Sequence, residues 1–493
     1  MKLNFKELSE NLENILIENL GTEFLINPFF RISKATPEQM HPYFMVMRNL
    51  PRPVILLTIL IQIPWYALKL AIGLTLSISF NHQYRGFNCN SHQRKNLFLS
   101  HGTPSNLTDQ KKDRFFDVLP EKISIHGKVP STVVYTNQSN FRYKKDIKLL
   151  QQKNQSTSHV LLPKFLKFKE NLDFISNVSL LAYRCLYVGI LLYVRDSTRS
   201  KILLASISSF FTRKTYANYL LRERMREFFQ NKLTVTFFLT FEGHSYEQML
   251  IDEALKYNND TKIYLYQHSP IVPYHFGIRN HLNHLDSKAC VLTTGAFYQE
   301  YLQSISSKCN FIVLGSNKAI YTKSYAAPKS ELILYVPEGT LRATFVILKL
   351  IHKLSMSLND HTHVLRLHPD LKTNSLVKIA LGVLKNHSNF RLSKSDLSSD
   401  LESSKFLLYR SSAVGIEALN YKTKPIFYAK PILKGLNVLF MDNSLHYQAV
   451  DAEDVISLIK LDFSDTLFNK GKEKLQELIT NLNYERILKF NLE

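Results

Sequence analysis

Short apolar runs alternate with segments of helical periodicity along most of this chain, beginning at Asn96. The runs are rich in β-branched and aromatic residues and end at glycine, proline, serine or asparagine, which is typical of buried strands. Alternation of strands with helices predicts parallel βαβ units. The predicted strands are 96–102, 131–137, 158–163, 233–243, 262–270, 289–295, 311–315, 331–340, 361–370, 389–394, 405–412 and 424–431.

Two series of these units are separated by residues 316–330, a polar, proline-containing and aperiodic stretch that we interpret as a linker. We therefore predict an α/β protein with two Rossmann-like domains facing a cleft. The predicted domains are 95–315 and 330–450, and helices in 451–493 are expected to pack across both. A helix is also expected over 111–125, from its sequence KKDRFFDVLPEKISI.

The N-terminal segment, residues 1–90, contains the most apolar stretch of the chain, from Pro53 to Phe80. It is long enough to span a bilayer, which takes about 20 residues. However, Pro64 would kink a helix, and Lys69 is costly at the centre of a membrane. A kinked transmembrane helix, an interfacial hairpin and a buried helix pair remain open. We expect this N-terminal helical segment to associate with a membrane.

A second apolar stretch, residues 177–194, resembles a membrane span in composition. Arg184 lies in its middle, so we predict a helix that is buried or lines a groove.

The chain has 493 residues with 62 Lys and Arg against 41 Asp and Glu, and the resulting charge of +21 is dispersed. This charge suits anionic membranes, nucleotides or phosphorylated lipids. No nucleic-acid recognition motif is present, so we predict no nucleic-acid partner. The cysteines form no CxxC pair, which indicates thiols in a reducing compartment, and the first residues carry no secretory signal. The cysteines are Cys89, Cys185, Cys290 and Cys309.

In the second series, three predicted strands end in residues that suit an anion. His368-Pro369 ends the run LRLHPDL, and His368 is also a catalytic candidate because its imidazole could donate to a phosphate or a leaving oxygen. Ser411-Ser412 ends the run FLLYRSS and opens a helix that either serine could cap. The carboxyl ends of parallel strands share one edge, where open α/β sheets bind ligands. Gly339 and Thr340 follow a third strand, and a glycine there lets backbone N–H groups approach a phosphate. The sequence thus predicts a phosphate-binding rim, although each residue could equally serve a structural turn or cap.

Three charged residues flank this rim. Arg366 and Arg410 lie near strand ends, and one of them could point into the cleft as a phosphate partner. Glu417 lies inside the helix after Ser412, from which a carboxylate could reach ribose hydroxyls, or it could be a solvated helix residue.

In the first series, two neighbouring strands present carboxylates and histidines. Glu242, with His244 and Glu247, follows one strand, and His268 follows the next. A group that deprotonates an acceptor hydroxyl must lie near the leaving phosphate, so Glu242 is our first candidate for the base and His268 the second. A hydrogen-bonded polar group at a strand end is the plain alternative.

A metal site from His275, His281, His284 and Asp286 matches no standard zinc spacing, so we predict no metal and no cofactor. The chain contains no GxGxxG, GxxxxGK[ST] or GxSxG motif, which argues against dehydrogenases, P-loop enzymes and α/β-hydrolases.

The order PEGT, LRLHPDL, YRSSAVGIEAL resembles the donor domain of bacterial surface-polysaccharide glycosyltransferases with the GT-B fold, including sialyl-, polysialyl- and capsule Kdo transferases. FLSHGT, FEGHSYEQ and YQHSPIVP are similar to O-antigen-type biosynthesis proteins. The resemblance covers roughly residues 95–440. It implies that His368, Ser411 and Ser412 bind the phosphate of a CMP-activated sugar, and Glu417 its nucleoside. It also places Glu242-Gly243 where sialyltransferases carry an acidic-acidic-glycine motif; here Phe241 replaces the first acid.

These observations favour a metal-independent GT-B glycosyltransferase at the cytoplasmic face of the inner membrane. Its expected partners are a nucleotide-sugar donor, with a CMP-linked acidic sugar favoured, a glycan or lipid-linked acceptor, and the membrane surface. Two alternatives remain open: a CDP-polyol phosphotransferase using the same cradle, and a non-catalytic scaffold of a polysaccharide assembly complex.

Overall fold

The computed structural model describes Pro53 and most of residues 95–490. The predicted membrane-associating stretch after Pro53 and most of the predicted linker lie outside the described residues. Within 95–490 the residues that are not described are 103–111, 138–149, 151–156, 164, 193, 196–199, 201–202, 205–206, 208–209, 211–212, 231–232, 274, 286, 317–329, 429–436 and 462–472.

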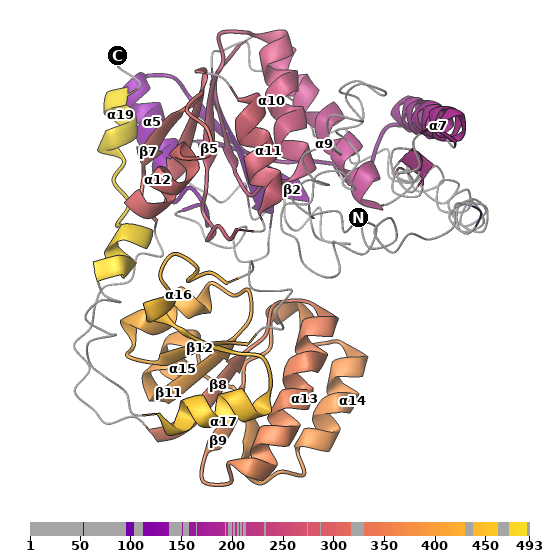
Figure 1. Ribbon diagram of the computed structural model, residues 1–493. Coiled ribbons are helices and arrows are strands. Elements are labelled where there is room, and N and C mark those ends of the chain that lie inside the picture. The colour runs from indigo at the N-terminus through magenta and orange to yellow at the C-terminus, as the bar shows by residue number, and fades with distance from the viewer. Residues whose placement is uncertain are drawn as a thin grey trace.

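The first sheet has seven parallel strands in the order β3-β2-β1-β4-β5-β6-β7 (Figure 1). Its strands are β1 (Lys95–Gly102), β2 (Ser131–Asn137), β3 (Ser158–Leu161), β4 (Thr234–Thr240), β5 (Lys262–Tyr266), β6 (Ala289–Thr293) and β7 (Asn310–Val313). Its helices are α5 (Leu119–Gly127), α7 (Phe168–Leu191), α9 (Arg213–Phe229), α10 (Ser245–Tyr257), α11 (Phe276–His284) and α12 (Ala296–Gln303).

The second sheet has six parallel strands in the order β10-β9-β8-β11-β12-β13. Its strands are β8 (Ser330–Val336), β9 (Thr362–Leu365), β10 (Phe390–Leu392), β11 (Ser404–Tyr409), β12 (Lys424–Tyr428) and β13 (Tyr447–Ala449). Its helices are α13 (Leu341–Ser357), α14 (Ser375–Leu384), α15 (Leu397–Ser403), α16 (Val414–Asn420) and α17 (Ala452–Lys460), with short 3₁₀ turns at Pro369–Leu371 and Asn443–Leu445.

Both sheets have the doubly wound strand order. Numbered from its own first strand, each sheet runs 3-2-1-4-5-6, and the first adds a seventh strand at the β6 edge. In such sheets successive strands are added toward one edge up to strand 3 and toward the other edge from strand 4. The strand order thus reverses between strands 1 and 4, and ligands bind outside the carboxyl ends at that switch point. The predicted fold class, two Rossmann-like α/β domains, is confirmed. Each predicted strand overlaps an observed one; β13 is an additional strand.

The central strands are buried on both faces, as expected for parallel sheets covered by helices. Across β1, β4 and β5 the rings of Phe98, Phe238 and Tyr264 stack in a row, with centroids 4.3 and 4.5 Å apart. All three side chains are at most 1% exposed. This aromatic row fixes the register of the strands whose ends carry the first-domain site.

The two domains contact each other beyond the carboxyl ends of strands from both sheets. Phe297, just after β6, and Tyr301 contact Phe440, which lies in the loop between β12 and β13, with centroids 5.9 and 5.4 Å apart. Both contact segments lie beyond the carboxyl end of a strand. The carboxyl edges of both sheets therefore lie on the sides where the two domains contact each other.

The helix predicted over 111–125 begins only at Leu119. Asp113 and Asp117 form a short antiparallel bridge instead, and Asp117 has a left-handed backbone with φ of 51°. Pro120 stands in the first turn of the helix, where a proline costs no hydrogen bond. The N-terminal half of the prediction was wrong because the Asp113 carboxylate accepts hydrogen bonds from the Phe115 and Phe116 amides, and these local bonds compete with the helix.

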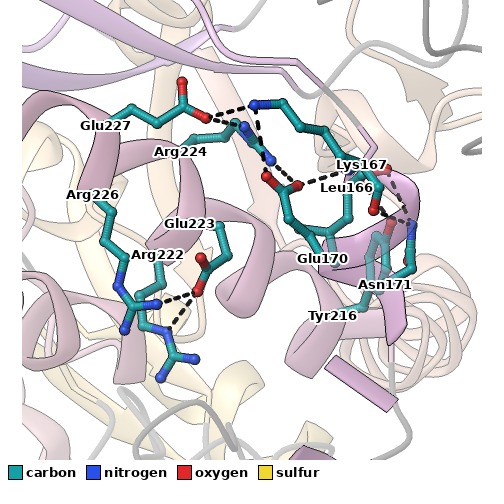
Figure 2. A network of polar contacts seen from close by, with 10 residues as sticks. All are labelled: Leu166, Lys167, Glu170, Asn171, Tyr216, Arg222, Glu223, Arg224, Arg226 and Glu227. Atoms are coloured by element: carbon teal, nitrogen blue, oxygen red, sulfur yellow. Dashed lines mark hydrogen bonds and ion pairs between the residues drawn. The ribbon is translucent and has the colours of Figure 1, made fainter. Parts of the chain in front are cut away.

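Figure 2 shows how α7 is attached to α9. The guanidinium of Arg224 on α9 is fully buried and donates to Glu170 on α7 and to Glu227 on its own helix. Asn171 of α7 donates to the Leu166 carbonyl at 3.1 Å. About 33% of the most apolar 18-residue stretch of α7 is buried. The prediction of a buried or groove-lining helix therefore holds for only one of its faces. By length and composition α7 could cross a membrane, and it is the one described helix of which this is true.

The C-terminal segment returns from the second domain to the first. After α17, the Thr480 amide donates to the Thr294 carbonyl at 2.9 Å, and the Asn483 amide donates to the Leu314 carbonyl at 2.9 Å. The chain ends its described part in α19 (Glu485–Phe490), whose Ile487 is buried in the core of the first domain.

Replacing Gly295 with alanine is expected to lower the free energy of unfolding by about 1–3 kcal/mol, a typical cost of overpacking. An added Cβ would lie 2.1 Å from the Glu477 carbonyl oxygen, so the returning segment would have to move. Denaturant unfolding measures the change. Gly127→Ala is the control, because nothing lies within 4 Å of its added Cβ. Equal stability of the two variants would show that the C-terminal segment is not closely docked.

Candidate functional site

A pocket of about 510 Å³ lies at the switch point of the second sheet. Loops after β8, β9 and β11 form it, so three strand ends that are far apart in sequence meet there. The described residues that line it are Val336, Pro337, Glu338, Gly339, Thr340, Arg366, Leu367, His368, Pro369, Ser411, Ser412, Ala413 and Val414. The structure thus brings together every predicted donor-binding residue except Arg410 and Glu417.

His368 and Gly339 lie directly against each other. His368 is exposed at the rim, and an added Cβ at Gly339 would lie 2.9 Å from its Nδ1 atom. Gly339 is therefore needed to leave room for the imidazole as well as for an approaching ligand. Thr340 caps α13, because its side-chain oxygen accepts from the Ala343 amide at 3.3 Å.

Gly339→Ala is expected to displace the His368 ring and to weaken nucleotide binding about tenfold or more, roughly the value of one charge-assisted hydrogen bond. Calorimetric titration of nucleotide measures the dissociation constant. Gly382→Ala, on an exposed helix with nothing within 4 Å of the added Cβ, should bind as the unchanged protein does. Unaltered binding by Gly339→Ala would exclude His368 as a ligand contact.

Of the two serines predicted as possible caps, Ser412 contacts the start of the following helix. Helix α16 begins at Val414 with Ala413 at its N-cap position and no side-chain cap bond. The Ser412 hydroxyl accepts from the Val414 amide at a long 3.4 Å, and Ser411 is buried. Ser412 directly precedes Ala413 and also lines the pocket.

Both arginines at this edge have carboxylate partners. Arg366 donates to Asp400 at 2.8 Å and to Ser393 at 3.2 Å. Arg410 is buried, and its Nη2 lies 3.8 Å from Glu338 Oε1. Glu417 lies in the first turn of α16 and is half-buried, but it is not among the described residues that line the pocket. Their roles toward a donor remain predictions.

The second cluster lies at the switch point of the first sheet. Glu242, after β4, has one carboxylate oxygen 3.1 Å from His244 Nε2 and the other 3.4 Å from His268 Nε2, after β5. The Glu242 side chain is 30% exposed, so solvent or a substrate reaches it. Both first-domain candidates, Glu242 and His268, therefore belong to one cluster of close polar contacts.

The charges of this cluster stabilise one another. Burial alone would raise the pKa of Glu242, but the hydrogen bond with His244 and the charge of His268 hold it well below its usual range. Desolvation disfavours the charged form of His244, yet the hydrogen bond to Glu242 raises its pKa. The arrangement keeps Glu242 ionised, as an acceptor of a proton must be.

Glu247 does not face the crevice, contrary to the prediction. It is fully buried and accepts from the amides of Glu242, Gly243 and His244 at 2.9, 2.8 and 3.1 Å. Burial raises its pKa to about 8. Gly243 has φ of 78°, which turns the chain back over the start of α10 and lets Glu247 bind this loop. Glu247 therefore holds the backbone that carries Glu242.

His101 is a member of this cluster that the sequence alone did not single out. It ends β1, next to β4, and its ring centroid lies 5.4 Å from that of Phe115 and 6.5 Å from that of Tyr246. Phe115 in turn contacts His268 at 4.8 Å. Burial and the nearby His244 lower the pKa of His101. Its position at a strand end beside the switch point is the signal that could have identified it.

The suggested metal ligands are spread over both ends of α11. His275 is the N-cap residue, His284 is exposed in the last turn, and His281 is buried with its Nδ1 3.6 Å from Glu247. Asp286 lies outside the described residues. Within the described part of the chain, no group of three or more His, Cys, Asp or Glu residues could hold a metal ion.

No protein-family model matches this chain, and no curated protein matches its sequence. Among solved structures it is similar to a UGT transferase from Siraitia grosvenorii in complex with UDP, with 10% identity, a TM-score of 0.47, and coverage of 81% of this chain and 100% of that one. It is also similar to S. aureus TarM, with 12% identity, a TM-score of 0.41 and coverage of 82% and 99%. S. aureus MnaA, solved with UDP, has 13% identity, a TM-score of 0.43 and coverage of 81% and 97%. These likenesses are too distant to assign an activity.

Proposed function

We propose that this protein is a glycosyltransferase of bacterial surface-polysaccharide synthesis. It would transfer a sugar from a nucleotide-activated donor to a glycan or lipid-linked acceptor. The observation that carries the proposal is that Gly339, His368 and Ser412, from three separate strand ends, line one pocket at a switch point. Residues 330–450 would bind the donor and residues 95–315 the acceptor.

The charges at the pocket favour a donor with a single phosphate, such as a CMP-linked acidic sugar. Both arginines at this edge are paired with carboxylates, Arg366 with Asp400 and Arg410 with Glu338. The imidazole of His368 lines the same pocket, where it can donate a hydrogen bond to a phosphate oxygen. Together with the hydroxyls of Thr340 and Ser412, it suits one phosphodiester charge better than the two charges of a diphosphate.

Glu242 is the proposed base that removes the proton from the acceptor hydroxyl. It is ionised and accessible, and it lies at the carboxyl edge that faces the donor domain. His268, 3.4 Å from Glu242, would stabilise the carboxylate before transfer. The acceptor oxygen would then attack the anomeric carbon of the donor, and the nucleotide would leave with the electrons of the bond that breaks.

The site of action in this proposal is the cytoplasmic face of the inner membrane. The apolar stretch between Pro53 and Phe80 supports membrane contact by its composition. Deletion of residues 1–90 is expected to weaken sedimentation with membranes, and unchanged sedimentation would remove this apolar stretch from the proposal.

A thermal-shift screen of the purified full chain against CMP, CDP, UDP and GDP tests the donor. A ligand at about 100 times its dissociation constant adds about 2.7 kcal/mol of stability, which is readily seen. We expect a shift with CMP. A shift with CDP alone would support the polyol-phosphate alternative, and no shift with any nucleotide would contradict the transferase and favour a scaffold.

A further inference from the structure

Helix α14, on the second domain, exposes an apolar face. Leu376, Ile379 and Val383 are 57%, 70% and 58% exposed and follow the i, i+3, i+7 spacing of one helix face. The opposite face, with Val377, Leu381 and Leu384, is buried in the second core. The outward residues are therefore additional to those that the fold needs for packing.

The chain segment that contains this face is basic. No aspartate or glutamate occurs from Leu371 to Ser395. A helix with an apolar face among lysines and no acidic residue is typical of segments that bind anionic membrane surfaces. The exposed cations in this stretch are Lys372, Lys378, Lys385, Arg391 and Lys394.

Helix α7, on the first domain, exposes a comparable face in its C-terminal half. Tyr183 and Tyr187 are stacked with centroids 6.2 Å apart, and both are exposed. Arg184 is exposed beside them, and a long cationic side chain beside apolar residues can keep its charge in water while its stem covers them. Tyrosines of this kind favour the interface between lipid and water. The other exposed apolar residues here are Leu180, Ile190, Leu191 and Val194.

Figure 1 shows α7 and α14 on the same side of the molecule, one on each lobe. We propose that the exposed faces of these two helices form a surface that docks on an anionic lipid bilayer. Each lobe thus presents an apolar face with exposed cations beside it, which suits an anionic lipid layer. This surface lies outside residues 1–90, and the proposal does not depend on the transferase activity.

The test places a polarity-sensitive dye on α14 and on the opposite side of the molecule. Gly382→Cys on α14 and Gly127→Cys on α5 are matched, since nothing lies within 4 Å of either added Cβ. Both are made in the full chain with Cys89→Ser, so that the introduced cysteine is the thiol that takes the dye. The other cysteines, Cys185, Cys290 and Cys309, are buried and should not react with it. The labelled proteins are mixed with vesicles of phosphatidylcholine, with or without phosphatidylglycerol, and vesicle binding is followed by sedimentation.

We expect the dye at position 382 to report an apolar environment with anionic vesicles only, and the dye at position 127 to stay in water. In the 382-labelled chain, the double substitution Lys378→Gln with Lys385→Gln should raise the anionic lipid concentration needed for half of the dye signal about 25-fold. Each lysine accounts for about fivefold of this loss of affinity. Sedimentation with vesicles while the dye at position 382 is unchanged would place the contact elsewhere and overturn the proposal. An equal change at both positions, or no vesicle binding at all, would overturn it as well.

Discussion

Replacing Glu242 with glutamine is expected to lower the turnover number by about 10²-fold or more, the usual contribution of a general base. The amide keeps the size of the side chain and can still contact His244 and His268, so the cluster should hold its shape. It cannot accept the proton of an acceptor hydroxyl. Turnover is measured as nucleotide released from the donor in the presence of acceptor.

Glu121→Gln, on α5 and away from both switch points, is the control and should retain full turnover. Unfolding midpoints of both variants should stay close to that of the unchanged protein. Near-normal turnover in Glu242→Gln would remove Glu242 from the role of base. His268→Gln would then be the next variant to measure, because His268 contacts the same carboxylate.

Replacing Arg224 with methionine is expected to lower the free energy of unfolding by about 3–5 kcal/mol, the usual cost of removing one partner from a buried ion pair. The variant fills a similar volume but leaves Glu170 and Glu227 without the guanidinium that now lies between them (Figure 2). Helix α7 should loosen from α9, because Glu170 is its charged link to Arg224. Chemical denaturation, with hydrogen exchange along α7, measures both effects.

Arg184→Met on α7 is the matched control, since Arg184 is exposed. Its effect on stability should stay within about 0.5 kcal/mol, as for most surface substitutions. A loss of less than about 1 kcal/mol in Arg224→Met would show that the buried guanidinium contributes little to the attachment of α7.

Much of the fold and of the donor pocket could be predicted from the sequence. Strand ends meet at one edge of a parallel sheet, so chemistry-bearing residues that end apolar runs are brought together by topology alone. This is why Gly339, His368 and Ser412, 73 positions apart at the extremes, line one pocket. The same reasoning applies to Glu242 and His268, whose strands are neighbours.

What the sequence did not predict depends on side-chain direction. Glu247 turns inward because Gly243 reverses the chain before α10, and the pattern of apolar residues carries no sign of that turn. The exposed face of α7 is as apolar as its buried face, so periodicity could not separate them. His101 was missed because its neighbours in space, Phe115 and Tyr246, come from elements far from it along the chain or across the sheet.

The most direct measurement of the central claim is calorimetric titration of CMP into three proteins: the unchanged chain, Gly339→Ala and Glu242→Gln. If the pocket at the second switch point binds the donor nucleotide, CMP binds the unchanged chain and Glu242→Gln equally and binds Gly339→Ala about tenfold or more weakly. Equal binding by all three proteins would place the nucleotide elsewhere. Absence of binding to the unchanged chain would contradict a CMP-linked donor.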